Sequence, residues 1–254
     1  MKNRTQTLLA LAIGTGFVLG LACSSRAADI YGTITFKGTP PPEVNIVPLK
    51  NDPNCGRLHK EMPTTHFYVV GINRGFGDVV VSLKGIHGAS SGTKAAPLVI
   101  DQKGCEYFPY VAACQTGQKI IVRNSDPVLH NVHVTPANTA NKEENHAQMA
   151  HGPDLTLAFS APEEFLRFKC DVHPWMFAYV SVFDHPWFAV SDNHGAYRIH
   201  NVPPGHYTVV AMHRKAGTEE RTIDVKSQDI NLDFTFAPAT AAPSRHDLAL
   251  MRRS

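Results

Sequence analysis

The sequence predicts an all-β protein built as two β-sandwiches. From residue 29 onward, short runs rich in β-branched and aromatic residues alternate with turns that contain Gly, Pro, Asn or Asp. No window shows a convincing helical period of apolar residues. The chain has 254 residues, 43% of them apolar, so a packed core is possible in each of two small domains.

The first element, residues 1–28, resembles a secretory signal segment. Basic residues precede an apolar run from Leu8 to Ala22, and small residues lead to a cleavage position after Ala27. The run is too short and too interrupted by glycine to span roughly 30 Å of hydrocarbon. We therefore expect a periplasmic or secreted protein whose mature chain has no transmembrane anchor. A lipoprotein attached through Cys23 is the less favoured alternative.

The charge balance gives no indication of nucleic-acid binding. The chain has 24 basic and 22 acidic residues. Removing residues 1–28 takes away three basic residues and no acidic one, which leaves 21 against 22 and a formal charge of −1. No basic surface that would attract phosphates is expected from such a balance.

The expected strands follow in order. Residues 29–97 form an N-terminal β segment, with strands in DIYGTITFKG and GDVVVSLKG. The next strands lie in PLVID, QKIIVRNSD, HNVHVTP, FLRFKC, FAYVSVF, GAYRIHNVPPG, YTVVAMH and INLDFTF. Residues 138–154 are polar and are interpreted as a loop, and residues 238–254 as a flexible Ala/Pro-rich tail.

Three cysteines remain outside the signal segment and the loop described below: Cys55, Cys105 and Cys114. An exported protein meets an oxidising compartment, where disulfides form. If residues 107–113 are extended, Cys105 and Cys114 lie roughly 30 Å apart, too far for a bridge. We favour a pairing of Cys55 with Cys105, although three is an odd number and the pairing stays open.

The stretch FKCDVHPWM, residues 168–176, places Cys170, His173 and Met176 at intervals of three. A thiolate, an imidazole and a thioether form the soft ligand set that copper selects. A mononuclear type 1 site also needs a second imidazole, and His130 in IIVRNSDPVLHNVHV supplies one. The sequence therefore indicates a copper site.

Other candidate ligands are less favoured. His133 lies three residues after His130, so it shares a strand face with Asn131 and not with His130. A second group, His146, Met149 and His151, lies in the polar stretch, where a solvated loop is the simpler interpretation.

The run FPYVAACQTGQKIIVRNSDPVLHNV resembles the cupredoxins, particularly plastocyanin and amicyanin, and CDVHPWM resembles the short amicyanin-type ligand loop. The resemblance covers residues 98–184 and implies a Greek-key cupredoxin sandwich with one type 1 copper. It implies that Asn131 lies beside the site with its backbone N–H directed at the thiolate. The implied copper ligands are His130, Cys170, His173 and Met176.

The same resemblance implies a function in electron transfer with periplasmic or envelope redox proteins. The alternative is a copper storage or delivery protein, or a cell-envelope binding protein, with no role in electron transfer. With all four ligand positions supplied by the protein, no position is open for a substrate, so we do not expect an enzyme. Oxidase-type sites are not indicated, because the ligand loop has one cysteine and no histidine lies two residues from another. In cupredoxins the downstream histidine reaches the surface within an apolar docking patch, here His173 with Pro174 and Trp175.

Residues 185–237 resemble the carboxypeptidase regulatory-like family, a transthyretin-like β-sandwich, through FAVSDNHGAYRIHNVPPGHYTVV. Gly195 would form the tight turn, and Tyr207, Val209 and Ala211 would alternate inward. The N-terminal segment resembles the opening strands of that family, so the cupredoxin is either inserted in the second sandwich or preceded by a separate β extension. Similar proteins are sometimes labelled methylamine utilisation proteins.

Overall fold

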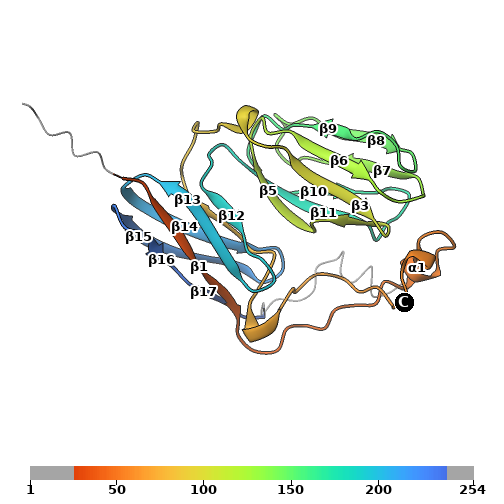
Figure 1. Cartoon of the computed structure of the whole chain (residues 1–254), viewed down its shortest axis with the longest axis horizontal. Coiled ribbons are helices and arrows are strands. Elements are labelled where there is room, and N and C mark those ends of the chain that lie inside the picture. The colour runs from red at the N-terminus through yellow and green to blue at the C-terminus, as the bar shows by residue number, and fades with distance from the viewer. Residues whose placement is uncertain (1–25, 239–254) are drawn as a thin grey trace, which may run out of the picture.

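The computed structural model describes residues 26–238, which form two β-sandwiches lying side by side (Figure 1). The predicted all-β class is confirmed, since the described chain consists of strands and a few short helical turns. Most of the signal segment, Cys23 within it and residues 239–254 of the tail lie outside the described residues. Among the described helices, none has the length and apolar character needed to cross a membrane.

The first sandwich consists of a 5-stranded sheet in the order β5-β11-β10-β7-β8 and a 4-stranded sheet in the order β4-β3-β6-β9. The strands of the larger sheet are β5 (Val111–Gln115), β7 (His130–Val134), β8 (Glu144–Gln148), β10 (Glu163–Lys169) and β11 (Phe177–Phe183). Those of the smaller sheet are β3 (Leu98–Lys103), β4 (Glu106–Phe108), β6 (Ile120–Asn124) and β9 (Leu155–Leu157). The core between the sheets includes Ile100, Ile120, Val122, Val132, Val134, Phe168 and Val180.

The interpretation of residues 138–154 as a loop was wrong in one part, because β8 lies within it. This strand pairs antiparallel with β7 along its whole length, from His130 opposite Gln148 to Val134 opposite Glu144. It lies at the edge of the sheet, so most of its side chains face solvent and only Gln148 is buried. A strand with one inward side chain shows no hydrophobic alternation that the sequence could reveal.

The second sandwich contains a 4-stranded sheet in which β1 pairs with β13, β16 and β17, and a 4-stranded sheet in the order β12-β2-β14-β15. The strands are β1 (Ala28–Phe36), β2 (Val80–Leu83), β12 (Phe188–Val190), β13 (Ala196–Val202), β14 (Gly205–His213), β15 (Gly217–Val225), β16 (Ile230–Asn231) and β17 (Phe234–Phe236). β1 and β2 come from the N-terminal segment, and the others follow the first sandwich in the chain. The strands of the first sandwich are thus flanked in sequence by those of the second.

Two details of the second sandwich depend on single sequence features. Gly195 has a positive φ of 78°, and a Cβ there would lie 2.0 Å from the carbonyl oxygen of Ile34, so only glycine fits.

The charged run GTEERTIDV forms β15, which the sequence did not suggest, because nearly all of its side chains are exposed. It is held by pairing with the whole of β14.

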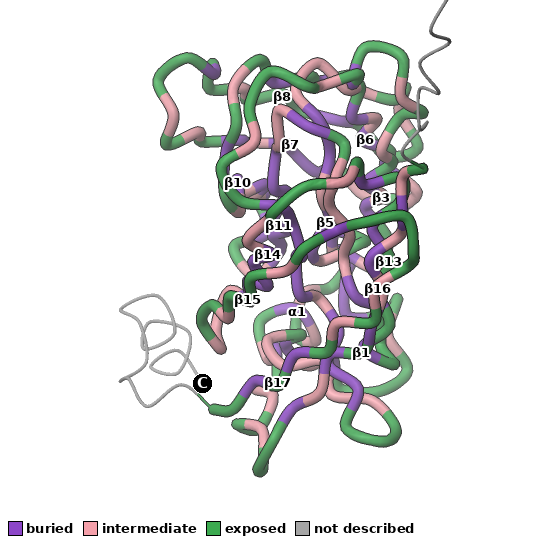
Figure 2. The backbone as a smooth tube through the Cα atoms, turned by 90° about the vertical axis from the view of Figure 1, so that its left-hand side faces the viewer, coloured by how far each residue is buried: buried purple, intermediate pink, exposed green. Residues whose placement is uncertain are grey.

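The two sandwiches pack against each other through β14, whose two faces are both covered. Val209 and Ala211 point into the core of the second sandwich, as the alternation predicted. Val210 and Met212 point the other way and pack with Val111 of the first sandwich. Buried segments therefore run through the contact between the sandwiches (Figure 2), and the unbroken apolar run VVAM reflects a strand buried on both faces.

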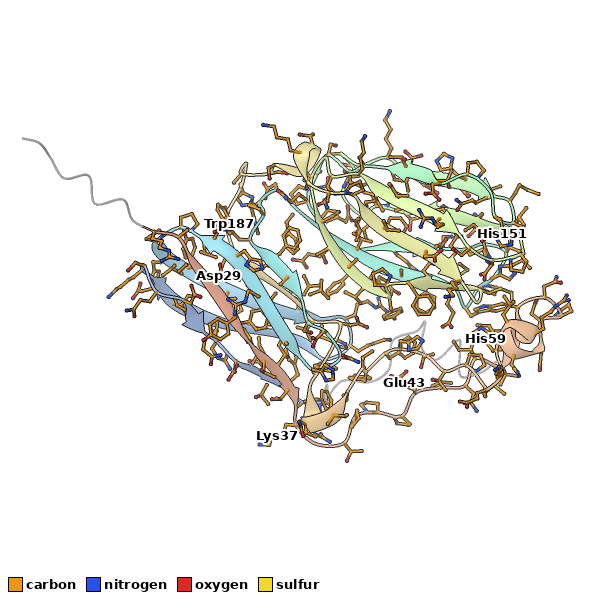
Figure 3. All side chains as sticks on the ribbon, in the orientation of Figure 1. Asp29, Lys37, Glu43, His59, His151 and Trp187 are labelled. Atoms are coloured by element: carbon orange, nitrogen blue, oxygen red, sulfur yellow. A yellow bond between two sulfur atoms is a disulfide. The ribbon has the colours of Figure 1, made fainter. Side chains whose placement is uncertain are left out.

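An arm, residues 37–71, leaves the second sandwich after β1 and runs to one end of the first sandwich before returning (Figures 1 and 3). Its tip contains α1 (Val47–Asn51) and η1 (Gly56–Leu58). Two further single turns, η2 (Ile72–Arg74) and η3 (Gly92–Lys94), lie in connecting loops.

A disulfide attaches the arm to the first sandwich. Cys55 at the tip of the arm is bonded to Cys105 in the turn between β3 and β4, which confirms the favoured pairing, and Cys114 is a buried free thiol. Beside the bond, a ring nitrogen of His59 lies 2.6 Å from the carbonyl oxygen of Gly104. The tip of the arm is thus held on the first sandwich by a covalent bond and a hydrogen bond.

We expect the double variant Cys55→Ala/Cys105→Ala to be less stable by about 2–4 kcal/mol, because the bond closes a long loop and restricts the unfolded chain. The bonded cysteines are 50 residues apart. Urea denaturation followed by circular dichroism measures the effect, with Cys114→Ala, which keeps the disulfide, as the control. Equal midpoints for the double variant and the unaltered protein would contradict the expectation.

Candidate metal centre

Adjacent strands of the larger sheet bring the predicted ligands together. His130 is the first residue of β7, and Cys170 directly follows β10, which pairs with β7. The loop from β10 to β11 then turns tightly, since the Cys170 N–H donates to the carbonyl of Met176 at 3.1 Å and the Met176 N–H donates to that of His173 at 2.9 Å. These bonds fold the loop so that Cys170, His173 and Met176 lie close together in it.

Three donor atoms converge at that point. His130 Nδ1 lies 2.9 Å from His173 Nδ1, which lies 3.6 Å from Cys170 Sγ. All three residues are buried, and Met176 is buried in the same core cluster as Cys170. Two imidazoles and a thiol with a thioether close by are the donor set of a type 1 copper site. The residues present therefore fit copper.

The thiol of Cys170 is prepared for metal binding. Burial by itself raises its pKa, but hydrogen bonds from His130, His173 and the backbone N–H of Asn131 outweigh burial and lower the pKa to about 6. The Asn131 N–H lies 3.4 Å from the sulfur, the contact that the cupredoxin resemblance implied. At neutral pH the thiolate, which is the ligand form, predominates.

Asp126 orients His130, and the sequence interpretation missed it. Its Oδ2 lies 2.9 Å from His130 Nε2, and its carboxylate accepts the backbone N–H groups of Gly104 and Cys105 at 2.6 and 2.7 Å. A carboxylate at Nε2 holds the proton there and leaves the Nδ1 lone pair for a metal. In the sequence, Asp126 is indistinguishable from the many aspartates that begin turns.

The pKa values of the pair agree with this arrangement. For His130, burial lowers the pKa, but the hydrogen bond to Asp126 and the contact with Cys170 together raise it by more, so the net change is upward. For Asp126, burial raises the pKa, and the bonds from His130 and the two backbone N–H groups outweigh burial and lower it. The carboxylate is therefore held in its charged form.

Asn131 joins β7 to the ligand loop through its side chain. Its Oδ1 accepts the Asp171 N–H at 2.5 Å, and its Nδ2 donates to Asn145 of β8 at 2.7 Å. The Tyr107 hydroxyl donates to the Asn131 carbonyl at 2.8 Å. These bonds connect β7 to the ligand loop and to β8, so Asn131 holds the loop in place beside the strand.

The less favoured candidate ligands lie elsewhere. The ring nitrogens of His133 are each 2.6 Å from a carboxylate, those of Asp171 and Glu143. Among the described residues, His133 belongs to no group of donor side chains as close as the one around Cys170. His146 pairs with Glu144 on the exposed face of β8, and Met149 is 64% exposed.

The expectation that His173 reaches the surface was wrong, since the residue is only 7% exposed. The reason is the arm: the sulfur atoms of Cys55 and Cys105 lie within 4.8 Å of a His173 ring nitrogen. Trp175 also packs beside it, with ring centroids 5.3 Å apart, and donates its Nε1–H to the Cys105 carbonyl at 3.2 Å. Pro174 remains exposed.

Comparisons with known proteins find partial structural similarity. No family model matches the chain, and no curated protein matches its sequence. A mutant of amicyanin in its Cu(I) form is similar over 40% of this chain and 97% of that protein, with 16% identity and a TM-score of 0.31. A purple cupredoxin from Nitrosopumilus maritimus is similar over 35% of this chain and 99% of that protein, with 20% identity and a TM-score of 0.28.

A larger copper protein is also similar to part of the chain. The copper-containing nitrite reductase from Thermus scotoductus SA-01 has 19% identity and a TM-score of 0.32 over 35% of this chain. The matched part spans 23% of that enzyme. The structural similarity to cupredoxins thus extends over about 40% of the chain at most in these three cases.

In the metal-free protein, we expect the ultraviolet absorbance of the Cys170 thiolate to rise with a midpoint near pH 6, the value to which its pKa is lowered. Because the pKa is lowered, the thiolate is present above that pH and lost below it. Cys170→Ser should abolish the step, and Cys114→Ser should leave it, since burial raises the pKa of Cys114 to about 12. A step seen only above pH 8 would contradict the assignment.

Proposed function

We propose that the protein is an exported type 1 copper protein that carries single electrons between redox partners. The observation that carries the proposal is the convergence of His130 Nδ1, His173 Nδ1 and Cys170 Sγ at one buried point next to Met176. A bound copper ion supplies a one-electron Cu(II)/Cu(I) couple. The donor set of the chain selects this metal, because thiolate and thioether are soft ligands.

The surrounding residues suit electron transfer more than catalysis. His130, His173, Cys170 and Met176 supply the whole ligand set, which leaves no position for a substrate, so we propose a carrier and not an enzyme. Asp126 and Asn131 hold the ligand residues through hydrogen bonds that do not depend on the metal. A ligand set held in this way changes little when the metal charge changes.

Export is part of the proposal. The Cys55–Cys105 disulfide supports an oxidising compartment, and the N-terminal signal segment supports secretion. We place the protein in the periplasm or outside the cell, with periplasmic or envelope redox proteins as partners. The second sandwich would serve as a transthyretin-like module without peptidase activity.

For electron exit we propose docking at Pro174 and Trp175. Pro174 is exposed, and Val172 on the same loop is 53% exposed, so this loop offers apolar surface close to the ligands. The indole of Trp175 is itself partly buried against two core clusters. A partner would therefore contact the loop at Pro174 and at the solvent-exposed part of Trp175, because the arm covers His173.

Copper storage or delivery is a second candidate function. The observation that favours it is the burial of His173, which is only 7% exposed beneath the arm. A carrier that exchanges electrons rapidly usually brings a ligand edge to the surface, whereas a storage protein benefits from enclosure. A colourless holoprotein that binds only Cu(I) would favour this alternative.

Loading the purified full chain with Cu(II) tests the main proposal. We expect an intense blue or green band from thiolate-to-copper charge transfer, lost in Cys170→Ser because the only thiolate ligand is removed. His130→Ala should also remove the band, and the matched variant His133→Ala should keep it, because His133 is bound to Asp171 and Glu143. The reverse outcome for the two histidines would reassign the upstream ligand.

Charge placed on the docking loop should slow electron exchange. We expect Val172→Glu to leave the copper spectrum unchanged and to reduce the exchange rate with the physiological partner several-fold, since a charge disfavours an apolar contact. This variant is a cleaner probe than Trp175→Glu, because Trp175 bonds to Cys105. Stopped-flow measurement compares it with Ile72→Glu, a change at a residue of η2 that is 75% exposed. Equal slowing in the two variants would contradict docking at the ligand loop.

A further inference from the structure

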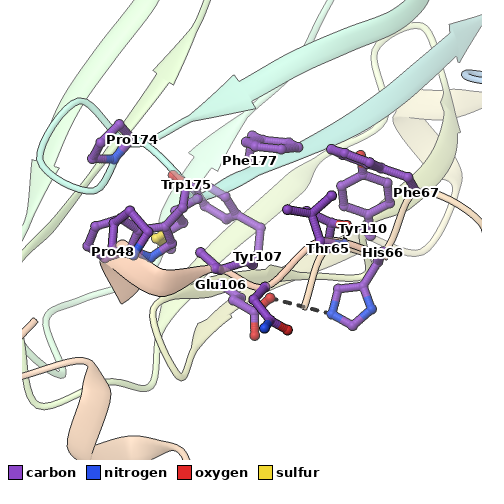
Figure 4. Close-up of a pocket in the computed structure, with 14 residues that line it drawn as sticks. Pro48, Thr65, His66, Phe67, Glu106, Tyr107, Tyr110, Pro174, Trp175 and Phe177 are labelled. Carbon is purple, nitrogen blue, oxygen red and sulfur yellow. Dashed lines mark hydrogen bonds and ion pairs between the residues drawn. The ribbon is translucent and has the colours of Figure 1, made fainter. Parts of the chain in front are cut away.

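A cavity of about 140 Å³ lies between the arm and the ligand loop (Figure 4). One side is formed by the two passes of the arm, residues 44–48 and 65–67. The other side is formed by residues 106–110, around β4 and the start of β5, and by residues 174–177 of the ligand loop. Pro174 and Trp175 of the proposed docking loop and the candidate ligand Met176 also line it, but the electron-carrier proposal gives the interior of the cavity no occupant.

The side of the cavity that the arm forms is an ordered part of the fold. The two passes of the arm run antiparallel, since the Ile46 N–H donates to the Pro63 carbonyl at 2.8 Å and the Thr65 N–H donates to the Val44 carbonyl at 2.9 Å. The Cys55–Cys105 bond beyond them fastens the tip of the arm. The arm is held at its base by the second sandwich and at its tip by the disulfide, so the cavity is preformed. A preformed site lowers the entropic cost of binding a ligand.

Five of the residues that line the cavity are Phe, Tyr or Trp, and the polar groups of two of these rings bond to backbone carbonyls outside it. The Tyr107 hydroxyl donates to the Asn131 carbonyl, and the Trp175 Nε1–H donates to the Cys105 carbonyl. With Phe67 and Phe177 these rings turn apolar surface toward the space. An apolar cavity of about 150 Å³ in another protein holds one benzene molecule, so this space suits a single six-membered ring.

One end of the cavity is polar. His66 Nε2 lies 3.4 Å from Glu106 Oε1, longer than the roughly 2.7–2.9 Å of a strong charge-assisted hydrogen bond. Glu106 is an acceptor with two oxygens, and its side chain is only 15% exposed. The Glu106 carboxylate is thus poorly solvated, and His66 does not use all of its capacity to accept hydrogen bonds. A hydrogen-bond donor on a bound ring would find an acceptor there. Figure 4 shows the pair beside Thr65 at this end.

We propose that this cavity binds a single-ring aromatic molecule that carries a hydrogen-bond donor, of the phenol class. The ring lies among the aromatic walls, and its hydroxyl donates to Glu106. Aromatic surface recognises the ring through its faces and edges, and the carboxylate selects the donor. This site goes beyond the electron-carrier function and does not depend on copper.

The test uses the metal-free full chain and 4-fluorophenol as the probe, followed by fluorine NMR. We expect saturable binding with a Kd on the order of 1 mM or tighter, as suits a ligand of this size. Fluorobenzene, which lacks the donor, should bind about tenfold more weakly, because the carboxylate then gains no partner.

Two sets of variants locate the site. Glu106→Gln should weaken 4-fluorophenol about tenfold and leave fluorobenzene unchanged, because only the charged acceptor is lost. The matched control Glu143→Gln changes a carboxylate that contacts His133 outside the cavity, and should have no effect. At Val44, which lines the cavity, binding should fall with side-chain volume from Val44→Ala through Val44→Leu to Val44→Phe.

Non-saturable binding of 4-fluorophenol would overturn the proposal, as would binding that Val44→Phe leaves intact in a folded protein. If Val44→Phe does not fold, the comparison of Val44→Ala with Val44→Leu decides in the same way. The copper proposal is tested separately, since NMR on metal-free protein responds only to the cavity, and the charge-transfer band of Cu(II)-loaded protein responds only to the ligand set.

Discussion

The convergence of two imidazole nitrogens on one buried thiolate is the constraint on which the rest of the structure depends. Three polar groups within hydrogen-bonding reach of one another, enclosed by apolar side chains, are stable only if each is oriented and satisfied. The fold meets this demand by placing the ligands at the ends of paired strands, where loops can turn freely. Cys170 and His130 lie at such ends, and the loop to β11 supplies the others.

The groups that satisfy the ligands connect the site to distant parts of the chain. Asp126 holds His130 and is itself held by the backbone of Gly104 and Cys105. Cys105 is bonded to Cys55 in the arm, and the arm begins and ends in the second sandwich. The environment of a candidate copper ligand therefore includes the arm, a segment that lies in sequence between strands of the second sandwich. The arm also creates the cavity and encloses His173.

Much of the site followed from local sequence, and the reason is its geometry. Cys170, His173 and Met176 occupy a single short loop, so their spacing reveals the donor set without knowledge of the fold. Strands with one buried face also appear as alternation, as in β1 and β13. By contrast, β8 and β15 show mainly exposed side chains, because they are edge strands held by their partners. Their polar sequences carry no such signal.

By itself the sequence determined the all-β class, indicated the candidate donor residues, and favoured the pairing of Cys55 with Cys105 without fixing it. The fold class and the candidate donor set depend on residue type and on short spacings, whereas the disulfide was favoured by excluding a bond between Cys105 and Cys114. Only the tertiary structure decided that Asp126 orients His130, that the arm buries His173, and that a cavity forms beside Trp175. Each of those joins segments far apart in the chain, and such contacts are set by the packing of whole sheets and not by the pattern within any one segment.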